Sequence, residues 1–239
     1  MTAPFDPSQT HQAVAIPAAL ADVSFPPVPR ERSAPVRRSA YRAGLKRAFD
    51  IFVVLLAAPA VVTFVAMLAL IVAFGGGNPF YSQIRVGMHG RHYRMWKLRT
   101  MVVDADARLE AYLAAHPEAR SEWDRTQKLR YDPRITRFGR ALRKSSFDEL
   151  PQLWNVLIGD MSLVGPRPMM TNQQHLYPGE AYYGLRPGIT GLWQVSARNN
   201  SDFADRAAYD HDYDRRLSFS TDLKLLLATV AVVMHGTGH

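Results

Sequence analysis

The sequence predicts a mixed α/β protein that is mostly helical and membrane-associated. It predicts an N-terminal, proline-kinked re-entrant membrane helix followed by a cytosolic domain. Residues 51–74 are apolar and carry no charge, and a helix of about 20 such residues reaches across a bilayer. Residues 80–100 are rich in aromatic and β-branched side chains, which is typical of strands. Three later stretches have the pattern of helices.

The composition is that of a folded chain, and its charge balance narrows the choice of partners. Of the 239 residues, 47% are hydrophobic and 21% are charged, so the chain as a whole is neither disordered nor collagenous. The absence of cysteine excludes a disulfide framework, thiolate metal sites and a cysteine nucleophile. A net charge of +8 predicts an anionic partner: nucleic acid, a phosphorylated small molecule or a lipid headgroup.

Residues 1–40 are predicted to form a disordered, proline-rich N-terminal tail. They hold seven of the sixteen prolines and show no sustained apolar period. The chain does not open with the charged and apolar regions of a signal peptide, so none is expected. Order is expected to begin near Tyr41.

Residues 41–77 are predicted to form the re-entrant membrane helix. Its apolar part, Ile51–Phe74, has 24 residues, and Pro59 near the middle removes a backbone hydrogen bond, which predicts a kink. Both flanks are basic, and basic flanks favour the cytoplasmic side. A helix that enters, breaks at Pro59 and returns keeps both flanks inside, so it is favoured over a single pass. Two alternatives stay open: the second basic flank binds a ligand, or the helix is a buried core helix.

Residues 78–239 are predicted to form the cytosolic domain. Residues 80–100 are expected to form a short hairpin or an extended segment, and residues 104–130 two helices separated at Pro117. Residues 145–159 are expected to be helical, and residues 160–200 to be loops rich in glycine and proline. The apolar helix expected over residues 223–234 is too short to span a bilayer, so it either packs on the core or lies in the membrane interface.

The densest chemical signal is a pair of carboxylates, Asp148 and Glu149. Ser146 to Glu149 fits a capping box, or Asp148 is itself the N-cap and Pro151 lies in the first turn. Either arrangement places both carboxylates at a helix N-terminus, which favours their ionised forms by about 0.3–1 kcal/mol. An ionised carboxylate acts as a nucleophile, a metal ligand or a base. Simple helix capping is the alternative.

Cations surround this pair in the sequence. Arg143 and Lys144 precede it, Arg167 lies in the tight turn that follows, and Lys97 and Arg99 come earlier. Guanidinium groups suit bidentate recognition of phosphate, although a solvated or lipid-facing run of charge is the alternative. There is no phosphate loop, dinucleotide fingerprint or zinc-protease helix. An acidic cluster beside His211 is interpreted as a solvated helix face or, alternatively, a metal-binding edge; it comprises Asp205, Asp210, Asp212 and Asp214.

Together these motifs resemble the bacterial sugar transferases, the polyprenyl-phosphate phosphoglycosyl transferases of the monotopic type, and among them the small exopolysaccharide-initiating form. The resemblance extends from about Gly44 to the end. It is carried by the segments 46–50 (KRAFD), 96–101 (WKLRTM), 132–136 (DPRIT), 142–152 (LRKSSFDELPQ), 155–157 (NVL), 159–168 (GDMSLVGPRP) and 186–191 (RPGITG). The chain departs from the family pattern at Ala58, Phe147 and Ala197, where Ser, Leu and Gly are usual.

The resemblance implies an activity. A sugar-1-phosphate, of the galactose or glucose type, would pass from a UDP-sugar to undecaprenyl phosphate with release of UMP, which starts an exopolysaccharide or O-antigen repeat unit. Asp148 is carried over as the nucleophile that forms a covalent phosphosugar ester, and Glu149 as the second catalytic carboxylate. Mg²⁺ is expected near Asp148. The substrate-binding residues expected are Lys97, Arg99, Arg143, Arg167 and Arg198.

The resemblance also implies a location and partners. We expect the bacterial inner membrane, with residues 78–239 as a sugar-phosphate transferase domain on the cytoplasmic face and membrane lipid as a partner. A homodimer is compatible with the membrane surface. Nucleic acid is not expected, because no recognisable binding module accompanies the basic residues. The alternative function is a catalytically inactive, membrane-tethered scaffold of a polysaccharide assembly complex.

Overall fold

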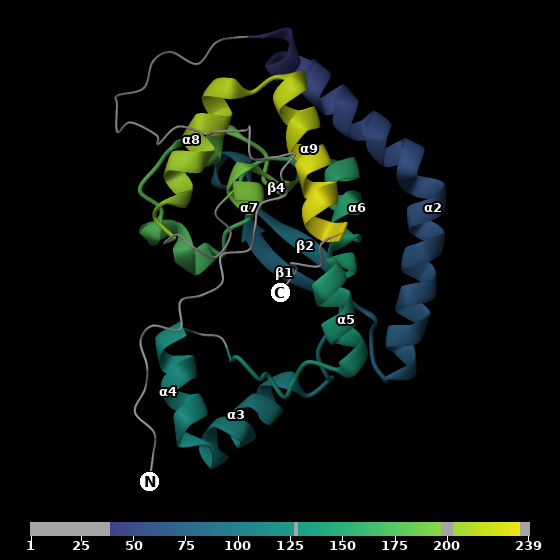
Figure 1. Ribbon diagram of the computed structural model, residues 1–239, viewed down its shortest axis with the longest axis vertical. Coiled ribbons are helices and arrows are strands. Elements are labelled where there is room, and N and C mark those ends of the chain that lie inside the picture. Colours follow the sequence, from purple (N-terminus) through teal and green to yellow (C-terminus); the bar gives the residue numbers. More distant parts are fainter. Residues whose placement is uncertain (1–38, 127–128, 197–202, 235–239) are drawn as a thin grey trace.

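The computed structural model describes residues 39–126, 129–196 and 203–234. A long helix runs along one side of a body of short strands and helices, and a pair of helices projects from one end (Figure 1). The mixed α/β, mostly helical class is confirmed. The predicted tail lies outside the described residues as far as residue 38.

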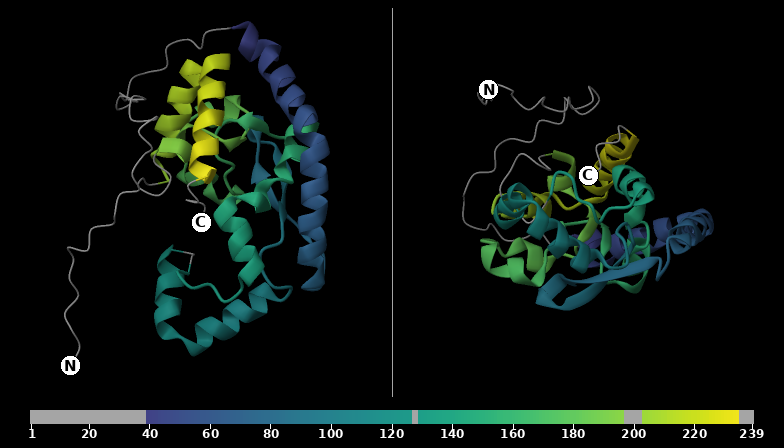
Figure 2. Two further views of the ribbon diagram at one scale, coloured as in Figure 1. Left: turned by 45° about the vertical axis from the view of Figure 1, so that its right-hand side comes forward. Right: turned by 90° about the horizontal axis from the view of Figure 1, so that it is seen from below.

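The long helix is the predicted membrane segment. A π-helical turn, η1 (Tyr41–Leu45), leads into α2 (Lys46–Phe74), which stays helical through Pro59. The Thr63 hydroxyl donates to the Pro59 carbonyl at 2.9 Å, and the ribbon bends along its length (Figures 1 and 2). Within the described part of the chain, this is the one helix long and apolar enough to cross a membrane, by length and composition. Only 11% of its most apolar window is buried against the protein.

The N-terminal end of α2 is fastened to the body by polar contacts. Asp50 is fully buried and accepts hydrogen bonds from the Ser162 hydroxyl at 2.8 Å and from the Leu163 amide at 3.1 Å. Lys46 Nζ lies 2.6 Å from a carboxylate oxygen of Asp222. The basic residues before the apolar stretch therefore dock this helix onto the rest of the protein.

The C-terminal end of α2 is fastened as well. Leu68 and Val72 share a hydrophobic cluster with Leu98 and Leu142, and Arg99 donates to the Val72 carbonyl at 3.3 Å and to the Gly76 carbonyl. Arg99 thus donates hydrogen bonds to carbonyl groups at the C-terminal end of α2, where a helix leaves such groups without backbone partners.

The predicted hairpin is confirmed. Strands β1 (Phe80–Val86) and β2 (His92–Leu98) pair antiparallel across a 3₁₀ turn, η2 (Met88–Gly90). Arg85 is opposite Tyr93, and Tyr81 is opposite Lys97. Directly opposed residues share a face and alternate residues along a strand do too. The register therefore sets Arg85, Met95 and Lys97 on one face of the hairpin.

The two helices predicted around Pro117 are also confirmed. They are α3 (Ala105–Ala115) and α4 (Pro117–Thr126), and they form the projecting pair in Figure 1. Pro117 opens α4, where its missing amide hydrogen is tolerated. Next comes α5 (Arg137–Ser145), whose N-cap residue Thr136 accepts from the Gly139 amide at 2.8 Å.

The helix expected over residues 145–159 is interrupted. Ser146 adopts a left-handed conformation (φ 57°) and ends α5, a 3₁₀ turn follows as η3 (Phe147–Glu149), and α6 covers Gln152–Ile158. The loop-rich region after it contains short elements: β3 (Ser162–Val164), η4 (Thr171–Leu176), η5 (Ala181–Gly184), β4 (Gly188–Thr190) and α7 (Leu192–Ser196).

Strands β3 and β4 pair in parallel. Gly165, directly after β3, allows the following loop to lie close against them. The Gly165 amide donates to the Thr190 carbonyl at 2.9 Å. A Cβ atom at Gly165 would lie 2.2 Å from the Arg186 carbonyl oxygen. This close backbone approach fixes the start of the turn that carries Arg167.

Three of the four residues of the acidic cluster do not form a solvated helix face. Asp210, Asp212 and Asp214 lie on α8 (Arg206–Arg216) and are buried, whereas Asp205, the N-cap residue of this helix, is exposed. Burial is tolerated because each carboxylate has a partner: Tyr177 for Asp210 (2.9 Å), Arg216 for Asp212 (2.8 Å) and Arg42 for Asp214 (2.7 Å). No group of three or more metal-ligating side chains occurs among the described residues, so the metal-edge alternative finds no support there.

The last helix, α9 (Phe219–Met234), packs on the core. Leu225 and Ala228 are buried, whereas Leu227 is 63% exposed and points away from the body. Of the two alternatives for this segment, packing on the core is therefore confirmed for one of its faces. The main hydrophobic cluster joins this helix to α2, β2, α6 and β3 through Leu225, Val54, Met95, Val156 and Val164.

Candidate active site

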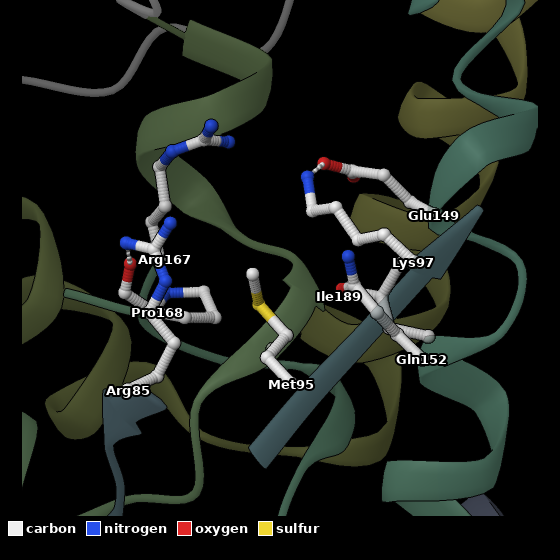
Figure 3. Close-up of a pocket in the computed structure, with 9 residues that line it drawn as sticks. Arg85, Met95, Lys97, Glu149, Gln152, Arg167, Pro168 and Ile189 are labelled. Atoms are coloured by element: carbon white, nitrogen blue, oxygen red, sulfur yellow. Dashed lines mark hydrogen bonds and ion pairs between the residues drawn. The ribbon is translucent and has the colours of Figure 1, made fainter. Parts of the chain in front are cut away.

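A small, open pocket lies against the hairpin face that carries Arg85, Met95 and Lys97. Arg85 and Arg167 stand on one side, and Lys97 and Glu149 stand on the other, with Met95 between them (Figure 3). The remaining lining residues are Gln152, Pro168, Gly188 and Ile189. The pocket thus collects residues from the hairpin and the turn after β3, together with Glu149 of the carboxylate pair; Asp148 and Arg143 are not among its lining residues.

The carboxylate pair is held in a different local structure from the one predicted. Asp148 and Glu149 lie in the 3₁₀ turn η3, and α6 begins only at Gln152 with Pro151 as its N-cap. Ser146 makes no side-chain cap, because it adopts the left-handed conformation that ends α5. The capping box and the Asp148 N-cap are therefore both wrong, and simple helix capping does not account for these carboxylates.

The Asp148 carboxyl is buried, with 7% of the residue exposed. Burial raises its pKa above the usual range; the positive charges of Lys97 and Arg143 oppose this rise, and the negative charge of Glu149 adds to it. The pKa of Asp148 is therefore set by burial and by these neighbouring charges, and not by a helix N-terminus as the sequence predicted. Removal of solvent from a carboxylate also increases its reactivity toward an electrophile held beside it.

Lys97 links the two carboxylates. Its Nζ donates to Glu149 Oε1 at 2.6 Å and lies 3.9 Å from Asp148 Oδ2. All three side chains are partly or fully shielded from solvent. The ammonium therefore sits where it neutralises charge on either carboxylate, or on an anion bound between them.

The other predicted cations have separate positions. Arg143 lies near Asp148, and its Nε donates to the buried Thr100 hydroxyl at 2.8 Å. Arg99 instead points to the end of α2, and it does not line the pocket. Arg167 lines the pocket. Arg198 lies outside the described residues. The structure brings together Lys97, Arg143, Arg167, Asp148 and Glu149, and it sets Arg99 apart.

Two residues of the pocket were not singled out from the sequence. In the sequence, Arg85 belongs to the basic flank that follows the apolar stretch, and Gln152 is the last residue of the motif 142–152. The predicted hairpin could have identified Arg85, because pairing its two strands sets Arg85 and Lys97 on the same face. Gln152 is 3% exposed, and no sequence signal distinguishes it from an ordinary helix residue.

The carboxylate pair fits Mg²⁺. This ion takes one or two carboxylates together with substrate phosphates and water, and it does not need a cage made only of protein ligands. Asp148 and Glu149 are adjacent and face the same ammonium. Their oxygens together with phosphate oxygens would complete such a ligand set. Asp148 is not itself a lining residue of the pocket, but it lies beside Lys97 and Glu149, which are. A shielded carboxylate next to cations suits attack on a phosphate group.

Comparison with known proteins gives consistent matches. The family model described as bacterial sugar transferase matches residues 41–236. The chain is 44% identical over 200 residues to the UDP-galactose-lipid carrier transferase of Erwinia amylovora, covering 81% of this chain and 41% of that protein. It is 42% identical over 199 residues to the exopolysaccharide production protein ExoY of Rhizobium meliloti, covering 81% and 87%.

A third relative is the undecaprenyl-phosphate galactose phosphotransferase of Salmonella typhimurium, which is 42% identical over 200 residues, covering 81% of this chain and 41% of that protein. The chain therefore spans about two fifths of the length of the Erwinia and Salmonella proteins and nearly nine tenths of the Rhizobium protein.

Proposed function

The chain belongs to the bacterial sugar transferase family, and on this premise we propose that it transfers a sugar-1-phosphate from a UDP-sugar to undecaprenyl phosphate. The names of two relatives support the lipid carrier and a galactose-type donor, and the name of a third supports a role in exopolysaccharide production. We infer a donor of the galactose or glucose type. The geometry supports the chemistry, because the buried carboxylate of Asp148 lies 3.9 Å from the ammonium of Lys97, and Lys97 lines the pocket together with two arginines that suit a diphosphate.

The proposed reaction has two steps. In the first, an oxygen of Asp148 forms a bond to the sugar-bearing phosphorus, and the bond from that phosphorus to the bridging oxygen breaks. The bridging oxygen keeps the electron pair and leaves on UMP. In the second, a phosphate oxygen of undecaprenyl phosphate attacks the same phosphorus, and the bond to Asp148 breaks. Asp148 returns to its ionised form, and the lipid carries the sugar through a diphosphate.

The surrounding residues have matching roles in this proposal. Lys97 and Arg143 hold the donor phosphates and favour the ionised form of Asp148. Arg167 contacts the diphosphate from the other side of the pocket. Glu149 orients or activates the acceptor phosphate. Asp148, with phosphate oxygens, would hold Mg²⁺, and this ion when bound would neutralise charge on the diphosphate.

We further propose that α2 is a re-entrant helix. Its N-terminal end is buried on the body through Asp50, and its C-terminal end packs on Leu98 and Leu142. A helix that crossed the bilayer would separate these ends by the membrane thickness, yet both contact one globular body. These contacts support a topology in which both ends lie on one face of the membrane, and the basic flanks favour the cytoplasmic face of the inner membrane.

The membrane helix also lies next to the carboxylate turn. The ring of Phe64 in α2 meets the ring of Phe147 edge to face, with centroids 5.1 Å apart. Asp148 is the next residue along the chain. A lipid phosphate held at the membrane surface along α2 would thus reach the site from the Asp148 side.

The single observation that carries the proposal is the buried carboxylate Asp148 beside Lys97. The Asp148→Asn variant should release no UMP and should not exchange labelled UMP into the donor, while it still binds the UDP-sugar. The measurement is UMP release over a panel of UDP-sugars, with undecaprenyl phosphate and Mg²⁺, together with mass spectrometry of donor-treated protein.

The matched control is Asp160→Asn, because Asp160 accepts from Asn155 at 3.3 Å and does not line the pocket. This variant should turn over at nearly the wild-type rate. Wild-type turnover by Asp148→Asn would reject the nucleophile, and absence of UMP release by the wild-type protein with every UDP-sugar would favour the inactive scaffold.

A further inference from the structure

Three arginine side chains from distant parts of the chain gather beside the pocket. Arg85 lies near the end of β1, Arg167 in the turn after β3, and Arg206 at the start of α8. Arg85 and Arg167 line the pocket. The guanidinium carbons of Arg167 and Arg206 lie 5.8 Å and 4.3 Å from the centroid of the Trp193 ring. Burial, and then the positive charges of Arg167 and Arg85, lower the pKa of Arg206 to about 10.

Within the part of the chain that the structure describes, none of these three arginines forms an ion pair with a carboxylate; all the ion pairs there involve other residues. Among the residues that the structure describes, Arg85 donates to oxygens of Gln83 (2.6 Å) and Pro168 (3.4 Å). Within the same ranges, the buried Nε atoms of Arg85 and Arg206 have no hydrogen-bond partner. Such unpaired donors are costly unless a ligand meets them.

One acidic residue does act on Arg206, but it is already engaged. Asp210 accepts from the Tyr177 hydroxyl at 2.9 Å, and burial raises its pKa to about 7. Near neutral pH it carries only part of a charge, so it does not neutralise three cations. The arrangement as it stands is repulsive, and a bound anion would relieve that repulsion.

The ligand chemistry that fits is a phosphate monoester dianion, which accepts several charge-assisted hydrogen bonds from guanidinium groups. In the proposed reaction two molecules carry such a phosphate: the leaving nucleotide and the lipid acceptor. The positions of the surrounding residues indicate which of the two lies on which side of the pocket. The contact between Phe64 and Phe147 places the membrane helix beside Asp148, whereas Arg85 and Arg167 stand across the pocket from Glu149 (Figure 3). The lipid phosphate thus belongs near the carboxylates and the nucleotide near the arginines.

We propose that Arg85 and Arg206, together with Arg167, form the subsite that holds the phosphate of the leaving nucleotide. This inference rests on the proposed function. When the bond between the sugar-bearing phosphorus and the bridging oxygen breaks, the electron pair remains on the nucleotide phosphate, which gains negative charge. Cations already placed there stabilise this charge without rearranging. The same subsite binds UMP as a product.

The test is the affinity of the full chain, in detergent, for UMP. In Arg206→Gln and in Arg85→Gln the Kd for UMP should rise about tenfold or more, because a charge-assisted contact is lost. The kcat/KM for undecaprenyl phosphate, which in a two-step reaction does not depend on the first step, should stay at the wild-type value in both. The matched controls are Arg215→Gln on the same helix and Arg91→Gln beside the hairpin turn, because both of these side chains are exposed; they should bind UMP as the wild type does.

Each alternative outcome is informative. If UMP affinity is unchanged while the kcat/KM for undecaprenyl phosphate falls, the arginines serve the acceptor and the inference is overturned. If the Kd for UMP and the kinetic constant for undecaprenyl phosphate are both unchanged in variants that still release UMP, the proposed function is retained and the arginine subsite is rejected. If the wild-type protein neither releases nor binds UMP, both proposals fail.

A structural role for Arg206 is distinguished by stability. The thermal midpoint is measured for each variant with and without UMP. Loss of the UMP-induced rise in midpoint, with the ligand-free midpoint retained, supports the subsite. A lowered ligand-free midpoint with a normal UMP-induced rise overturns it. Arg206→Lys keeps the charge and should recover part of the UMP affinity, which keeps the test valid if Arg206→Gln fails to fold.

Discussion

At the scale of single residues, the properties of Asp148 come from opposed effects on one carboxyl. Burial raises its pKa, and the nearby ammonium of Lys97 is the first influence that lowers it. A nucleophilic carboxylate has to be ionised, so activity depends on this balance. In the proposed reaction, the proton that Asp148 holds at low pH has to leave before the first step begins.

Replacement of Lys97 should therefore change the pH dependence of the reaction. The acidic limb of the rate profile should follow ionisation of Asp148, so it should lie above the usual range for an aspartate. Removing the ammonium in Lys97→Met raises the pKa of Asp148 further, because the influence that lowers it is lost. The acidic limb of kcat should then move to higher pH, as measured by UMP release across a pH series.

The control for this prediction is Lys144→Met. Lys144 is exposed, so this change alters net charge by the same amount and should leave the limb in place. A limb that does not move in Lys97→Met, or one that moves to lower pH, would contradict the assigned role of the ammonium.

At the scale of elements, the site depends on how closely α5 approaches the end of β2. A Cβ atom on Gly139 would lie 2.0 Å from the Thr100 carbonyl oxygen. The Thr136 amide donates to the same oxygen at 3.1 Å. Because α5 ends directly before the carboxylate turn, its distance from β2 sets the distance between Asp148 and Lys97.

The Gly139→Ala variant tests this dependence. The added methyl group cannot fit, so α5 should shift and the hydrogen bond from Arg143 to Thr100 should weaken. We expect a loss of about 1–3 kcal/mol in stability, as is typical of overpacking, and a marked loss of kcat in the UMP-release assay.

The comparison variant is Gly184→Ala, where an added Cβ has no neighbour within 4 Å. It should retain both stability and rate, as measured by thermal unfolding and the same assay. If Gly139→Ala behaves like this control, the position of α5 does not determine the site.

At the scale of the whole molecule, one long apolar helix is fixed at both ends to one body. This arrangement makes the topology testable, and the chain has no cysteine to interfere with labelling. Ala43, before α2, and Tyr81, after it, are both exposed. Single cysteines at these positions report on which side of the membrane each end lies.

In Ala43→Cys and Tyr81→Cys, a membrane-impermeant maleimide should label neither protein in intact cells and both after permeabilisation. Labelling of one position in intact cells would show a single pass and would contradict the re-entrant helix. The same pair in a Pro59→Leu background tests whether the proline sets the topology, because leucine restores the missing backbone donor.

Much of the local structure was predictable from the sequence because it depends on near neighbours. The hairpin, the break at Pro117 and the apolar helix all follow from side-chain pattern and backbone constraints. The capping box failed because Ser146 takes a left-handed conformation, which ends α5 one residue before the carboxylate turn. The prediction that the acidic side chains of α8 face solvent was wrong for Asp210 and Asp214, because partners from distant segments allow these carboxylates to be buried.

The sequence by itself determined the family, the mixed class with one apolar helix, and the carboxylate pair with its neighbouring cations, because these depend on residue type and spacing. Only the tertiary structure decided which cations meet. Arg85 joins Arg167 and Arg206 across 121 residues of chain, whereas Arg99 turns to the end of α2. The reason is that electrostatic interaction falls with distance in space, and distance in space follows from packing.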